Sequence, residues 1–199
     1  MTRFFIFLVL SIPITIVSWR TIFDTKSHGF YRFFSWECII WLFASNYLFW
    51  FVEPFSLNQI FSWILLFLSI YLVVAGVLTL KKGRNSESVR NEETLYKFEK
   101  TTELVESGIF KYIRHPLYSS LLFLTWGIFL KNPVAELFII SVLSSVFLYF
   151  TSYFDEKECI SYFGEKYQTY MKKTKRFVPY IFWNNAEMKL KNPIKQLLY

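Results

Sequence analysis

The sequence predicts an all-α polytopic membrane protein with five transmembrane helices, a cytoplasmic loop and a helical C-terminal tail. Hydrophobic residues make up 54% of the 199 positions and charged residues only 19%, whereas a typical soluble domain carries about 25% charged residues. Aromatic residues reach 22%. The apolar residues gather in long stretches, and a helix needs about 20 such residues to cross a bilayer. We therefore expect residues 1–199 to form a single integral-membrane domain.

The apolar stretches define the five predicted spans in order. The first carries no charged residue, and the third has no ionisable group except Tyr71. The stretch 116–154 is too long for one span and is interrupted by Lys131, Asn132 and Pro133, so it fits two antiparallel helices joined by a turn. The predicted spans are residues 4–19, 29–52, 57–80, 116–130 and 133–154.

Most of the polar residues fall in loop 81–115 and tail 155–199. In the loop, the charged segment 92–106 is expected to be helical. In the tail we expect an amphipathic helix over 155–162, a break at Gly164, a second helix through Tyr167 and Tyr170, and a frayed basic helix over 184–199.

The basic residues predict the orientation. With the N-terminus outside, all but Arg3 and Lys131 of the 22 Lys and Arg lie on the cytoplasmic side, as the positive-inside rule requires. We therefore expect a protein of the cell (inner) membrane with a cytoplasmic C-terminus. The net charge of +7 then faces anionic membrane lipids, and no nucleic acid partner is expected.

Two polar clusters at the cytoplasmic ends of the last two spans carry the candidate chemistry. Arg114 and His115 precede Pro116, which suits the first turn of a helix, and Asp155 and Glu156 begin the tail. Because these spans form a hairpin, the two clusters should be neighbours in one site. The simpler alternative is that Arg114 reaches lipid phosphates, His115 caps its helix, and the carboxylates only favour a helix start.

Other polar residues suggest no further site. The sequence contains no glycine-rich phosphate loop, no zinc-protease motif and no nucleophile elbow. Cys38 and Cys159 lack metal-ligand spacing, and no metal is predicted. His28 is expected in a loop near the interface, and Glu37 either pairs with Arg32 or lies near the interface.

Two sequence blocks around the polar clusters are recognisable. Residues 104–110 read LVESGIF and residues 114–118 read RHPLY. The tail contains DE at 155–156, FGEKY at 163–167 and RFVP at 176–179. Together the blocks resemble the LVxSGIYxxxRHPxY and EExxLxxxFGxxYxxY…RxxP signatures of the isoprenylcysteine carboxyl methyltransferase family, over roughly residues 99–182.

The resemblance implies S-adenosylmethionine as methyl donor, bound in a cytoplasmic pocket between the last two spans, the loop and the tail. Carboxylates and aromatic rings suit the ammonium and sulfonium groups of this donor. The implied catalytic residues are Arg114 and Glu156. The implied cofactor-binding residues are Leu104, Val105, Phe110, His115, Pro116, Tyr118, Asp155 and Glu156.

Three positions depart from the family pattern. Thr151 stands where the family has an arginine that engages the substrate carboxylate, Asp155 replaces a glutamate, and Phe110 replaces a tyrosine. We therefore expect a retained cofactor site and a different lipophilic small-molecule or lipidated substrate, with a carboxylate, thiol or phospholipid amine as acceptor. The alternatives are a membrane reductase using NADPH, whose RHPNY motif is related but has Asn in place of Leu117, and a non-catalytic lipid-binding membrane protein.

Overall fold

The computed structural model describes residues 1–82 and 103–178, and this part of the chain is all-helical. Its helices are α1 (Thr2–Ser18), α2 (His28–Asn46), α3 (Leu57–Lys82), α4 (Pro116–Phe129), α5 (Ala135–Phe163) and α6 (Glu165–Lys173), with short 3-10 turns η1 (Tyr47–Phe49) and η2 (Gly108–Lys111). The prediction of an all-α protein is confirmed.

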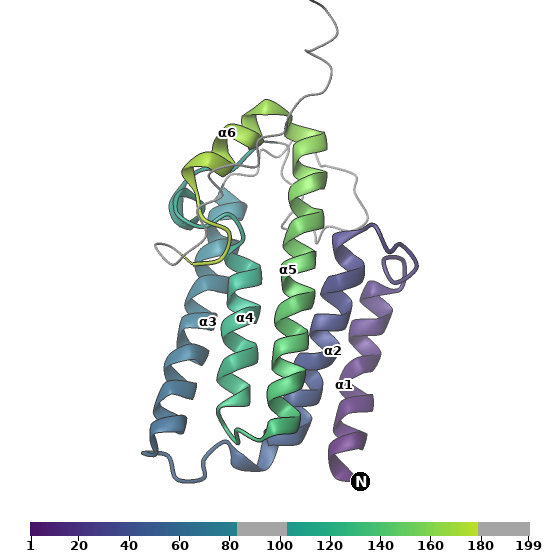
Figure 1. The fold of residues 1–199 in the computed structure, drawn as a ribbon, viewed down its shortest axis with the longest axis vertical. Helices are drawn as coiled ribbons and strands as arrows, with labels where there is room; N and C mark the ends of the chain where they lie inside the picture. The colour runs from purple at the N-terminus through teal and green to yellow at the C-terminus, as the bar shows by residue number, and fades with distance from the viewer. Residues whose placement is uncertain (83–102, 179–199) are drawn as a thin grey trace, which may run out of the picture.

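Helices α1 to α5 run side by side along the long axis of the molecule, and α6 lies across one end (Figure 1). Helix α5 packs along α2, where the rings of Tyr31 and Phe154 stack with centroids 4.9 Å apart. Helix α4 packs closely on α3, where Gly127 leaves room for Leu66. Because α5 extends past the ends of its neighbours, α6 and the following segment fold back over α3 and α4 (Figure 1).

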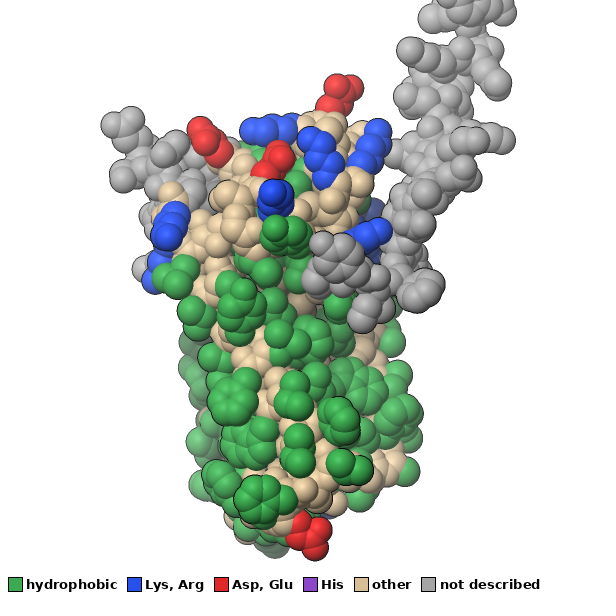
Figure 2. Space-filling model, turned by 90° about the vertical axis from the view of Figure 1, so that its left-hand side faces the viewer, with side chains coloured by type: hydrophobic (Ala, Val, Ile, Leu, Met, Phe, Trp, Pro, Cys, Tyr) green, Lys and Arg blue, Asp and Glu red, His purple; other side chains and the backbone are tan. Residues whose placement is uncertain are grey.

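Two of the described helices, α3 with 26 residues and α5 with 29, are long and apolar enough to cross a membrane. Helices α1 and α4 are apolar but shorter, with 17 and 14 residues. Hydrophobic side chains cover the visible length of the bundle, whereas most of the visible Lys, Arg, Asp and Glu gather at the end that carries α6, with one acidic side chain at the opposite end (Figure 2). This distribution is what a bundle surrounded by lipid presents on its surface.

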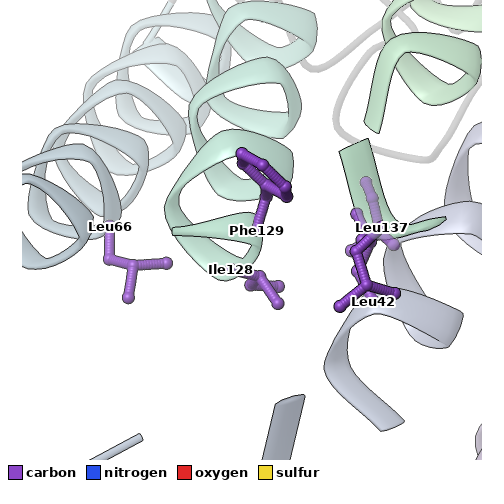
Figure 3. Close-up of a cluster of buried hydrophobic side chains, with 6 residues drawn as sticks. Leu42, Leu66, Ile128, Phe129 and Leu137 are labelled. Carbon is purple, nitrogen blue, oxygen red and sulfur yellow. The ribbon is translucent and has the colours of Figure 1, made fainter. Parts of the chain in front are cut away.

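The apolar core lies at the end of the bundle away from α6. Its buried residues come from four helices and include Leu42, Leu66, Ile128, Phe129 and Leu137 (Figure 3). Further along the bundle, hydroxyl groups replace apolar contacts. Ser35 of α2 and Ser144 of α5 lie 3.0 Å apart (Oγ to Oγ). Such interhelical hydrogen bonds hold helices together where burial from water supplies little driving force.

The structure corrects three boundaries. The predicted tail helix over 155–162 is not separate, because α5 continues without a break to Phe163. The helix of the second predicted span, 29–52, ends at Asn46, well before the predicted end. Of the predicted loop helix, only 103–106 falls among the described residues, and it is not helical; the remainder of that helix and the predicted helix over 184–199 lie outside them. The predicted break at Gly164 and the following helix are confirmed as the start and extent of α6.

Candidate ligand site

The segment before α4 forms one wall of the site. Turn η2 begins at Gly108, which has φ +57, a left-handed conformation that glycine adopts without strain. A Cβ atom there would also lie 2.7 Å from Thr79 Oγ1 of α3. After η2 the chain turns at Tyr112 and reaches His115, which precedes α4. Pro116 starts α4 at the position where a missing N–H costs nothing.

The segment after α6 pairs with this wall through its backbone. Ile113 and Lys175 form a parallel β-bridge, in which Lys175 N donates to Tyr112 O over 3.1 Å and Arg114 N donates to Lys175 O over 2.8 Å. Beyond the bridge, His115 N donates to Arg176 O over 3.1 Å. The hydroxyl of Ser119 donates to the carbonyl of Phe177 over 2.6 Å. These contacts hold residues 174–177 against the start of α4.

Arg114 connects the two polar clusters. Its Nε donates to Glu156 Oε1 over 2.9 Å, and its Nη1 donates to the carbonyl oxygens of Met171, over 3.0 Å, and Thr174. Arg176 pairs with the same Glu156 carboxylate. The side chains of Arg114 and Glu156 are only 3% and 5% exposed, so this is a buried ion pair completed by further hydrogen bonds, the arrangement that burial of charge requires.

His115 lies between the two carboxylates. Its Nδ1 is 3.3 Å from Asp155 Oδ2 and its Nε2 is 3.3 Å from Glu156 Oε1. Burial disfavours the charged ring, but the hydrogen bonds and charges of Asp155 and Glu156 outweigh it, and the pKa of His115 is raised. Both ring nitrogens can donate only when the imidazole is protonated, so the geometry fits an imidazolium.

The pKa values of the two carboxyl groups shift in the opposite direction to that of His115. Asp155 and Glu156 lie beyond Phe154, where the apolar part of α5 ends. Burial would raise the pKa of Glu156, yet the hydrogen bond and charge of His115 and the charge of Arg114 lower it to about 2. Burial is likewise outweighed at Asp155, where His115, His28 and Arg32 lower the pKa well below its ordinary value. The cluster therefore holds two carboxylates in their ionised form.

A cavity of about 700 Å³, a volume that includes its open mouth, lies between these elements. Its walls come from α3, the segment before α4, the first turn of α4, the end of α5 and α6. The described lining residues are Leu80, Leu104, Val105, Phe110, Arg114, His115, Pro116, Leu117, Tyr118, Asp155, Cys159, Phe163, Tyr167 and Tyr170.

Most residues that the sequence singled out meet at this cavity. Leu104, Val105, Phe110, Arg114, His115, Pro116, Tyr118 and Asp155 all line it. Glu156 is not among the described lining residues; its carboxylate is directed to Arg114, His115 and Arg176 instead. The two predicted polar clusters therefore do form one site.

Other contributors were missed by the sequence analysis. Phe163, Tyr167 and Tyr170 recur at a helical spacing in the tail, a pattern that could have indicated a shared face. Tyr170 donates its hydroxyl to the carbonyl of Phe110 over 2.6 Å. Arg176 was noted only as part of the final sequence block, and its ion pair with Glu156 had no local signal.

The expectation for His28 is corrected. His28 is not a loop residue at the interface: it begins α2, is 0% exposed, and places Nδ1 2.8 Å from Glu158 Oε2. Glu37 accepts a hydrogen bond from Ser11 of α1 over 2.6 Å. The two options for Glu37, a pair with Arg32 or a place near the interface, stay predictions.

The fold and the site together define a helical membrane protein with a ligand cavity at one end of its bundle. A family model for phospholipid methyltransferases matches residues 57–168, more than half of the chain. The chain belongs to this family of integral-membrane methyltransferases. The family is related to the isoprenylcysteine carboxyl methyltransferases, whose signatures the sequence resembles. No curated protein and no solved structure gives a significant match. The matched residues contain the whole RHPLY block and both carboxylates of the site.

Proposed function

We propose that this membrane methyltransferase uses S-adenosylmethionine to methylate a lipophilic acceptor at the cytoplasmic surface of the membrane. The observation that carries the proposal is Asp155. It is the only carboxylate among the described residues that line the cavity, and its pKa is lowered although it is largely shielded from water, with 15% of its side chain exposed. An ionised carboxylate in a largely apolar cavity suits a cationic ligand.

The lining residues fit the donor by chemistry. Asp155 would bind its ammonium group, and His115 and Arg114 would attract its carboxylate. The aromatic rings along the cavity would face its sulfonium and adenine groups; the described ones are Phe110, Tyr118, Phe163, Tyr167 and Tyr170. The donor supplies a methyl group on a positively charged sulfur, which is open to direct attack by a lone pair of the acceptor.

The protein's task in such a transfer is alignment and exclusion of water. The implied catalytic residues, Arg114 and Glu156, would have different roles in this alignment. Arg114 lines the cavity, whereas Glu156 would hold Arg114 and His115 in place through its buried hydrogen bonds. We therefore assign the donor contact to Asp155 and a positioning role to Glu156.

The acceptor would reach the cavity from the bilayer. We propose five membrane spans, with α1, α2 and α4 joining α3 and α5, and an outside N-terminus, because the cavity lies at the end where basic side chains gather (Figure 2). Thr151 is fully buried and its hydroxyl donates to the carbonyl of Phe147. No arginine occupies this position to engage a prenylcysteine carboxylate, so a phospholipid amine, another carboxylate or a thiol is the expected acceptor.

Calorimetric titration of the purified protein with S-adenosylmethionine tests the donor. We expect saturable binding by the wild type and at least a tenfold loss for Asp155→Asn, whereas Glu37→Gln, a matched carboxylate-to-amide change on α2, should keep wild-type affinity. Incubating membranes with methyl-labelled donor and identifying the labelled lipid or protein tests the acceptor. Absence of binding by the wild type would refute the proposal. Thermal protection by NADPH instead would favour the reductase alternative.

A further inference from the structure

His28 lies at the site although it precedes the family match. The matched residues begin at position 57, on α3, and His28 is the first residue of α2. Its side chain is completely buried, next to the polar end of α5. The chain contains two histidines, and both lie beside Asp155: His115 by its ion pair, and His28 by the electrostatic attraction that lowers the carboxyl pKa.

Glu158 fixes the position of His28 through two contacts. Its Oε1 accepts from the backbone N–H of His28 over 3.2 Å, and its Oε2 lies 2.8 Å from the ring Nδ1. The first contact satisfies one of the free N–H groups at the start of α2 and places a negative charge at the positive end of that helix. The backbone and the ring of His28 are therefore both held by α5.

Asp155 is one helical turn before Glu158 on α5. One ring nitrogen of His28 and one carboxylate oxygen each of Asp155 and Glu158 lie within 4.8 Å of one another. Burial opposes a charged His28, but the hydrogen bond to Glu158 and the charge of Asp155 outweigh it, so its pKa is raised. Arg32, the next turn of α2, adds a second positive charge that lowers the pKa of Asp155.

The groups that face Asp155 divide by helix. His115 approaches from the segment before α4, at 3.3 Å. His28 and Arg32 act from α2, and Cys159 Sγ lies 3.8 Å from Asp155 Oδ1 within α5. Of these four residues, only His28 and Arg32 are not among the described residues that line the cavity. They can therefore orient and ionise Asp155 without touching a ligand.

We propose that His28, held by Glu158, is a positioning residue that keeps Asp155 oriented toward the cavity, so that the first turn of α2 forms part of the donor site. This inference rests on the proposed use of S-adenosylmethionine. The start of α2 thereby takes part in the site together with the matched residues 57–168. When protonated, His28 would also balance the charge of Glu158, the second carboxylate on the same face of α5.

Donor binding tests this role directly. In calorimetry with S-adenosylmethionine, His28→Ala should weaken binding, because Asp155 stays ionised but loses the group that orients it. His28→Asn should recover part of the loss, because its side-chain N–H can replace Nδ1–H toward Glu158 while the charge is missing. Glu37→Gln, also on α2, should bind as the wild type does. If wild type binds the donor and His28→Ala binds equally well, the positioning role is refuted.

A second readout separates positioning from general destabilisation. In ring-labelled protein the wild type shows two histidine signals, and His28→Ala and His28→Asn each leave only that of His115. Removing the positive charge beside Asp155 should raise the pKa of His115 further. An unchanged His115 pKa in both variants would overturn the inference. Failure of the wild type to bind donor would instead refute the proposed function, and the His115 titration would still report the contact.

Discussion

Arg114 and Glu156 are 42 residues apart in sequence and are joined by a hydrogen bond of 2.9 Å in the interior of the protein. The bond joins the segment before α4 to the end of α5. Arg114 also donates to the carbonyls of Met171 and Thr174, so one guanidinium ties together α5, α6 and the start of α4. The cavity lies where these three elements meet, and its shape depends on this pair.

Replacing one member of the pair should be costly. Arg114→Met leaves the Glu156 carboxylate buried with one partner fewer, and breaking a buried pair in this way typically costs about 3–5 kcal/mol. We expect a correspondingly lower unfolding temperature in detergent, measured by intrinsic fluorescence. The double variant Arg114→Met with Glu156→Leu should cost less than the sum of the two single changes, because it removes both members of the pair at once, although Arg176 and His115 then lack the Glu156 carboxylate. A double variant as unstable as the sum of the two single changes would contradict this coupling.

The Arg114 interaction shows what the sequence could and could not predict. The apolar stretches predicted the helices because burial in lipid requires a long apolar run, and the hairpin of α4 and α5 placed Arg114 near Glu156. The partners of His28 and Arg176 could not be predicted. The pattern of apolar residues does not say which neighbouring helix the polar end of a helix faces. The pairing of residues 174–177 with the chain before α4 uses backbone groups that every residue carries, so it leaves no signal in the sequence.

The His115 cluster should make stability depend on pH in a defined way. The folded pKa of His115 is raised above 6.5, so its contribution is complete below pH 6.5 and is lost as the pH rises through the folded value. The pKa of Glu156 is lowered from 4.5 to about 2, so its contribution is complete above pH 4.5 and is lost as the pH falls toward 2.

His115→Gln tests the basic side of this dependence. The glutamine does not titrate, so the difference in unfolding free energy between wild type and variant should shrink as the pH rises above 6.5. His28 titrates in both proteins, so the difference reports mainly His115. Denaturant unfolding between pH 5 and 9 measures it, and a difference that stays constant over this range would show that the pKa of His115 is not raised in the folded protein.

Gly108 should resist substitution for two separable reasons. Alanine at φ +57 carries the left-handed penalty of about 1–2 kcal/mol, and its Cβ would lie 2.7 Å from Thr79 Oγ1. We expect Gly108→Ala to lower stability by about 2 kcal/mol or more and to weaken donor binding, since η2 carries the cavity residue Phe110. Adding Thr79→Ala should recover only the steric part. Full recovery in the double variant would mean that the backbone conformation costs nothing.

Lys131 lies between α4 and α5, at the end of α4 away from the cavity, and its charge is held by aromatic rings. The residue is only 5% exposed. Its Nζ donates to Gln59 Oε1 over 2.9 Å and lies 3.7 Å from the ring centroid of Trp63 and 5.3 Å from that of Trp50. Such a contact contributes about 2 kcal/mol when it is shielded from water.

Lys131→Ala should therefore destabilise the protein without affecting the cavity. It removes the contact with the indole rings and leaves Gln59 Oε1 without its donor, and a buried group that loses its partner costs about 1–3 kcal/mol. We expect a loss of about 2–3 kcal/mol in denaturant unfolding, with unchanged affinity for S-adenosylmethionine. Lys111→Ala, an exposed lysine at the opposite end, should change stability by less than about 0.5 kcal/mol. Equal stability of the two variants would mean that the aromatic rings do not stabilise the charge, and weakened donor binding by Lys131→Ala would mean that the two ends of the bundle are coupled.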